Sequence, residues 1–191
     1  ALQAKKHVIA FEPLVRNCRC LLKNITANGW VDDTEVFPLA LAAKPGVAQL
    51  YGAGTGASLI SGWNYASNHS AVPISSMDIV FGKRLNGERV LVLVDVEGAE
   101  YQLLQGAKVL LASRPKPVWM VEITLDENRP AARNPYFLET FKLFRNFDYE
   151  TYGINAETGK MEKLSGEQIE MLFASNDKTF IRSFVFMEKT A

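Results

Sequence analysis

The chain has 191 residues, of which 48% are hydrophobic and 22% charged, and this mixture indicates one folded domain rather than a disordered chain. Lysine plus arginine and aspartate plus glutamate each number 21, so the basic excess typical of a nucleic-acid binder is absent. No apolar run approaches the roughly 20 residues that a membrane span needs. The two cysteines, Cys18 and Cys20, exclude a disulfide framework, so we expect a soluble cytoplasmic protein.

Strand-like and helix-like segments alternate along the chain, which predicts an α/β fold with a mostly parallel sheet. The apolar run at 7–11 predicts a strand, and apolar residues at helical spacing over 14–25 predict the helix that follows. Further strands are expected at 35–41 and 47–51.

Residues 52–70 are rich in glycine, serine, alanine and asparagine, and they predict a long loop. Loops of this length within a compact domain are usually functional or mobile, so we expect a flexible element on the substrate side or a structural element. Trp63 and Tyr65 lie in this loop, where an exposed ring could stack on a sugar or an apolar substrate. The glycines at 52–56 follow no long buried strand and open no helix, so we do not assign them to a cofactor.

The run at 90–96 is the most apolar in the chain and predicts a buried strand in the centre of the sheet. A helix with an apolar face follows Gly98, and 118–123 predicts another strand. Residues 180–187 predict a closing strand that runs antiparallel to the others.

Two helices are expected between the last two predicted strands. The first is begun by Asn134-Pro135 and turns Phe137, Phe141 and Phe144 inward. In the second, Ser165 and Gln168 predict a capping box at the first turn.

Acidic residues stand where predicted strands end: Glu12, Asp95 and Glu122. Ligands of open α/β sheets bind at the carboxyl ends of strands, and a carboxylate there can accept both hydroxyls of a ribose. An acid at such a position can also simply cap the next helix, as Glu97 and Glu100 could do. Asp95 favours a functional role, because a carboxylate within an apolar strand is costly unless it is paired.

Several fragments in order resemble the FkbM-type methyltransferases. They are Glu12-Pro13 after the first strand, Asn17 in the next helix, 38–41 (PLAL), 94–107 (VDVEGAEYQLLQGA) and 117–123 (PVWMVEI). The resemblance runs from about residue 8 to about residue 150. It implies a Rossmann-like class I sheet and S-adenosylmethionine-dependent methylation of a hydroxyl oxygen.

The resemblance also implies roles for individual residues. Glu12 and Pro13 would lie at the ribose of S-adenosyl-L-methionine, and Leu39, Ala40 and Leu41 beside its adenine. Asp95 would lie close to the sulfonium and the acceptor. The base that takes the hydroxyl proton would be Asp95, Glu97 or Glu100, in that order, with His69 a remote fourth. No metal ligands are expected.

The family's first strand, with its acidic, glycine-rich turn, is expected before residue 7 and is not found there. We therefore expect residues 1–191 to be a single methyltransferase domain truncated at its amino end and lacking the first β-α unit. The acceptor would be a hydroxyl of a small metabolite, sugar or glycolipid, with no nucleic-acid partner. Two alternatives remain: a non-catalytic Rossmann-like domain that has lost the cofactor turn and acts in binding or assembly, and a dinucleotide oxidoreductase.

Overall fold

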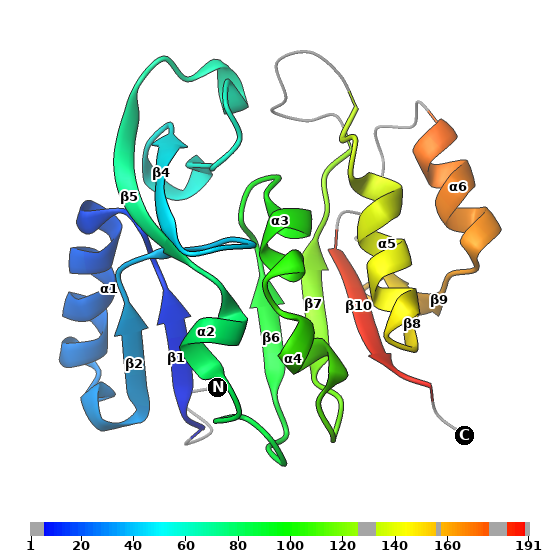
Figure 1. Ribbon diagram of the computed structural model, residues 1–191, viewed down its shortest axis with the longest axis horizontal. Helices are drawn as coiled ribbons and strands as arrows, with labels where there is room; N and C mark the ends of the chain where they lie inside the picture. The colour runs from blue at the N-terminus through cyan, green and yellow to red at the C-terminus, as the bar shows by residue number, and fades with distance from the viewer. Residues whose placement is uncertain (1–5, 126–132, 156–157, 176–182, 190–191) are drawn as a thin grey trace.

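The computed structural model describes residues 6–125, 133–155, 158–175 and 183–189. Figure 1 shows the strands β2, β1, β6, β7 and β10 arranged in that order across the molecule, with helices α2, α3 and α4 in front of the middle strands. Among the described residues, no helix has the length and apolar character that crossing a membrane requires.

The amino-terminal part is a parallel pair of strands, β1 (Val8–Phe11) and β2 (Thr34–Phe37). The connection runs through helix α1 (Val15–Ala27) and a short 3-10 helix, η2 (Val31–Asp33). Cys18 on α1 is buried and Cys20 is exposed, as expected of a helix with one apolar face. Gly29 ends this helix region with a φ of +69°, a left-handed conformation that glycine adopts without strain.

A three-stranded sheet follows, in the order β3-β5-β4. Its strands are β3 (Ala40–Leu41), β4 (Gly46–Tyr51) and β5 (His69–Ser75), and β5 pairs parallel with β3 and antiparallel with β4. The single strand predicted over 35–41 is thus divided between two sheets. Pro38 stands at the break, where its missing N–H prevents the ladder from continuing.

The largest sheet has the order β6-β7-β10-β8-β9. Its strands are β6 (Leu91–Val94), β7 (Val118–Glu122), β8 (Tyr149–Ile154), β9 (Met161–Lys163) and β10 (Ser183–Glu188). β6 and β7 are parallel, whereas β10 is antiparallel to both of its neighbours, which confirms the antiparallel closing strand. The expectation of a mostly parallel sheet holds only in part, because β8 and β9 add further antiparallel pairing.

The prediction of a central, buried strand at 90–96 is wrong. β6 lies at the edge of its sheet, and Leu91 and Leu93 are 71% and 72% exposed while Val94 is 2% exposed. Successive side chains of a strand point to opposite faces. One face of β6 is covered by helices α3 (Glu100–Gln105) and α4 (Lys108–Ala112), and the other face is open.

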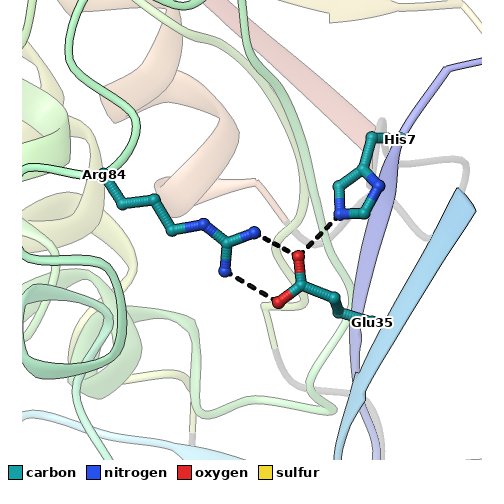
Figure 2. A network of polar contacts seen from close by, with 3 residues as sticks. All are labelled: His7, Glu35 and Arg84. Carbon is teal, nitrogen blue, oxygen red and sulfur yellow. Dashed lines mark hydrogen bonds and ion pairs between the residues drawn. The ribbon is translucent and has the colours of Figure 1, made fainter.

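β1 and β6 do not pair with each other in the described structure, although they lie next to one another in Figure 1. A charge cluster links their amino-terminal ends (Figure 2). The Glu35 carboxylate on β2 accepts two hydrogen bonds from Arg84, which lies between α2 (Met77–Phe81) and β6, and contacts His7 Nε2 at 2.6 Å. The hydrogen bonds from Arg84 and then His7 lower the pKa of Glu35 to about 2.

The core of the carboxyl-terminal half is aromatic. Helix α5 (Phe137–Asn146) buries Phe137, Phe141 and Phe144, as predicted, and Phe144 stacks on Phe186 with ring centroids 3.7 Å apart. The helix begins at Phe137 rather than at Asn134-Pro135, because Asn134 Oδ1 accepts from the Tyr136 backbone N–H in the turn before it. In contrast, α6 (Gly166–Ala174) begins with the predicted capping box of Ser165 and Gln168.

Candidate active site

A pocket lies where the carboxyl ends of β1 and β6 converge with the segment that follows β4. It is a small hollow of about 130 Å³ that opens to solvent. Seven of the site residues expected from the sequence line it: Glu12, Pro13, Leu39, Ala40, Leu41, Asp95 and Glu97. The structure thus brings together residues that are more than 80 positions apart in the chain.

Glu12 directly follows β1 and is half-buried, with its carboxylate held by two hydrogen bonds. The Leu14 backbone N–H donates to Oε1 over 2.7 Å, and Asn17 Nδ2 donates to Oε2 over 3.2 Å. Each carboxylate oxygen can accept a second hydrogen bond, so the fixed carboxylate can still bind two adjacent hydroxyl groups. Asn17 also lines the pocket and ties helix α1 to this wall.

The wall beside Glu12 is apolar. Ala40 and Leu41 of β3 are 8% and 7% exposed, and Leu39 precedes them at the pocket surface. Leu50 of β4 lines the pocket beside them. The pocket thus has an apolar wall next to an acidic side chain.

Asp95 and Glu97 line the pocket from the turn after β6. Asp95 lies one residue beyond the strand and is exposed, so the expectation of a carboxylate buried within an apolar strand is wrong. Glu97 is half-buried with a φ of +54°, and its Oε2 accepts from Trp63 Nε1 over 3.2 Å. Burial raises the pKa of Glu97, and the negative charges of Asp95 and Glu122 raise it further, whereas the hydrogen bond from Trp63 opposes the shift.

Two expected residues lie elsewhere. Glu100 does not line the pocket; its side chain is 2% exposed and its Oε1 accepts from the Gly98 backbone N–H over 2.7 Å at the start of α3. His69 begins β5, is exposed and packs beside the Tyr51 ring, also away from the pocket lining. Their placement favours structural roles for both.

The segment between β4 and β5 forms a wall of the pocket, although the sequence analysis assigned the glycines at 52–56 to no cofactor site. Gly54, Thr55, Ala57 and Leu59 line it, and the Gly54 carbonyl accepts from Asn17 Nδ2 over 2.9 Å. The only available signal in the sequence was the length and the small-residue composition of this loop.

The prediction that Trp63 offers an exposed ring for stacking on substrate is wrong, because the side chain is 0% exposed. Its burial is explained by the turn after β6, which it covers. The side chain of Tyr65 lies outside the described residues, so that prediction is not tested. In the part of the chain that the structure describes, no group of three or more His, Cys, Asp or Glu residues is arranged to hold a metal ion.

Comparison with known proteins identifies the family and the fold. The sequence model of the methyltransferase FkbM domain matches residues 1–151. The fold is similar to the crystal structure of methyltransferase FkbM from Methylobacillus flagellatus KT, with a TM-score of 0.54 and 12% identity. The match covers 95% of this chain but only 36% of that one. No curated protein sequence matches significantly. On the family match over residues 1–151, the chain belongs to the FkbM methyltransferase family.

Proposed function

We propose that the chain binds S-adenosyl-L-methionine in this pocket and transfers its methyl group to a hydroxyl oxygen of a small metabolite, sugar or glycolipid. The observation that carries the proposal is the Glu12 carboxylate, which two hydrogen bonds fix at one side of the pocket, with Asp95 and Glu97 in the same lining. Family membership supports the reaction class.

The residues of the pocket fit this cofactor in charge and polarity. Glu12 offers acceptors for the ribose hydroxyls, and Leu39, Ala40 and Leu41 offer an apolar surface for the adenine. The cofactor is cationic at sulfur, and the acidic pair Asp95 and Glu97 supplies opposite charge in the same pocket. The pocket therefore has a hydroxyl-binding, an apolar and an anionic part.

When bound, S-adenosyl-L-methionine supplies a methyl group activated by the sulfonium. The chain's own contribution is to hold the reactants close together and to accept the proton of the acceptor hydroxyl. We assign proton acceptance to Glu97, because its half-buried carboxylate lines the pocket and because burial and the neighbouring acids raise its pKa, which makes it a stronger base. Asp95, which is exposed at the pocket surface, attracts and orients the cationic group.

The test is calorimetric titration of S-adenosyl-L-methionine into the chain and into the Glu12→Ala variant. Losing a charge-assisted contact to the ribose should weaken binding about tenfold or more. Glu139→Ala is the matched control, because Glu139 is an exposed acid of α5 that pairs with Lys142. Equal affinity of the Glu12→Ala variant, or no binding by the unaltered chain, would refute the proposal; the latter favours a non-catalytic domain.

Asp95→Asn tests the electrostatic role of Asp95, with the affinity for S-adenosyl-L-methionine measured by calorimetry beside turnover so that binding and chemistry can be told apart. With sugar hydroxyls as acceptors and S-adenosylhomocysteine as the measured product, turnover should fall about 100-fold, because the charge facing the cation is removed. Near-normal turnover would show that Asp95 has no electrostatic role.

A further inference from the structure

The segment between β4 and β5, which we call the wall loop (residues 52–68), is closed on itself and attached to the rest of the pocket. The Gly52 backbone N–H donates to the Asn68 carbonyl over 3.0 Å, and Tyr51 and Ser58 form a β-bridge. Two short 3-10 helices, η3 (Gly54–Gly56) and η4 (Trp63–Tyr65), lie within it. The wall loop thus has a defined course over the pocket.

Among the described side chains of the wall loop, Trp63 is the least exposed. Its side chain is 0% exposed and lies against the backbone of Gly98, where an added Cβ would come within 2.3 Å of ring atom Cζ3. Gly98 also has a φ of +92°, which residues other than glycine rarely adopt. The Trp63 ring can therefore pack in this position only because residue 98 is a glycine without a side chain.

The wall loop holds Glu97 at two points. Trp63 Nε1 donates to Glu97 Oε2 over 3.2 Å, and Ser58 Oγ donates to the Glu97 carbonyl over 2.6 Å. The second contact fixes the backbone of a residue whose φ of +54° is unusual for a glutamate, and the first fixes its carboxylate. The rotamer of Glu97 is thus set by the loop as well as by its own turn.

We propose that Trp63 is a positioning residue of the site: it fixes the Glu97 carboxylate at the pocket lining and anchors the wall loop on the turn after β6. The inference rests on the proposed function for the role of Glu97. An indole serves both purposes because its ring fills the space over Gly98 while its N–H reaches the carboxylate. A phenylalanine has no N–H and would lose the hydrogen bond while still placing an aromatic ring in the site, although without the outer ring atoms of the indole that lie over Gly98.

This difference between the two aromatic residues defines the experiment, which uses the Trp63→Phe and Trp63→Leu variants of the chain. The control is Trp30→Phe, because Trp30 is half-buried at the end of the α1 region and does not line the pocket. Two measurements are made without cofactor: the ¹³C NMR titration of the Glu97 carboxyl group, and amide hydrogen exchange of residues 53–60. A third is calorimetric titration with S-adenosyl-L-methionine.

In Trp63→Phe, the Glu97 titration should move to higher pH, because a hydrogen bond that favours the charged carboxylate is gone. Loop exchange should rise less than in Trp63→Leu, because an aromatic ring still fills much of the space that the indole occupies, and cofactor affinity should change little. In Trp63→Leu, exchange of residues 53–60 should rise by about tenfold or more, because the ring that anchors the loop is truncated. Trp30→Phe should change none of the three.

An unchanged Glu97 titration in Trp63→Phe would overturn the proposal, and so would unchanged loop exchange in a folded Trp63→Leu. If Trp63→Leu does not fold, the Trp63→Phe titration decides the matter. A failure of the unaltered chain to bind S-adenosyl-L-methionine would refute the proposed function instead, since the titration and the exchange are read without it.

Discussion

Substitution of Gly98 by alanine should destabilise the folded chain, because the added methyl group would clash with Trp63. In Gly98→Ala the new Cβ would lie 2.3, 2.7 and 3.1 Å from three atoms of the Trp63 ring, which is fully buried and cannot swing into solvent. The φ of +92° adds backbone strain. Overpacking and backbone strain each cost about 1–3 kcal/mol, so we expect the free energy of unfolding to fall by about 2–6 kcal/mol. That is a large part of the about 5–15 kcal/mol of a typical domain.

Urea unfolding with matched variants separates the two causes. Gly29→Ala is the control for strain alone, because Gly29 has a φ of +69° and no atom within 4 Å of the added Cβ. The double variant Gly98→Ala with Trp63→Leu removes the clash and keeps the strain, so the pair should show a coupling energy of about 1 kcal/mol or more. The reasoning is refuted if Gly98→Ala costs no more than Gly29→Ala, or if the two changes are additive.

Three further predictions concern charge and surface. The pKa of Glu97 is raised above 4.5 in the folded chain, so ionisation of Glu97 lowers the free energy of unfolding as pH rises. In urea unfolding at pH 7, Glu97→Gln should therefore raise the free energy of unfolding, by less than about 1 kcal/mol because the group is partly solvated. Below pH 4.5 the substitution should bring no gain. The pKa of Glu35 is about 2 in the folded chain, so the stabilisation that its ionised carboxylate provides is present above pH 4.5 and is lost as the pH falls toward 2. The thermal unfolding temperature of Glu35→Gln should therefore fall less in acid than that of the unaltered chain. An equal fall would contradict this prediction. Replacing exposed Leu91 and Leu93 by threonine should reduce self-association in light scattering without changing cofactor affinity, because an open apolar edge strand promotes association.

Much of the local structure could be predicted because it depends on neighbours in the chain. The capping box of Ser165 and Gln168 involves residues three apart, and the inward stripe of Phe137, Phe141 and Phe144 follows from helical spacing alone. The pocket could be predicted in outline for a similar reason. Acids that follow strands meet at one edge of an α/β sheet whatever the rest of the fold, and Glu12 and Asp95 do so here.

Features set by distant partners could not be predicted. The run at 90–96 is apolar at successive positions, which is typical of a strand covered on both faces, but its sequence does not encode what lies over each face; Leu91 and Leu93 are exposed. Trp63 in a polar loop gives no sign of its burial, since its partner Gly98 lies 35 positions away. β8 was not predicted, although its side chains alternate between buried and half-buried positions.

The acidic turn after β6 was recognised from the sequence, but its three acids, Asp95, Glu97 and Glu100, were all treated as candidates for the same catalytic role. Its acids differ in surroundings: Asp95 and Glu97 line the pocket, whereas Glu100 is buried and accepts the Gly98 N–H. Gly98 itself is required by the ring packed on it. Asp95 and Glu97 line the hollow, whereas Glu100 and Gly98 build the turn that presents them. Since only a group that reaches the pocket can meet a bound substrate, catalysis should depend directly on the first pair, and on the second pair only through the position of Glu97.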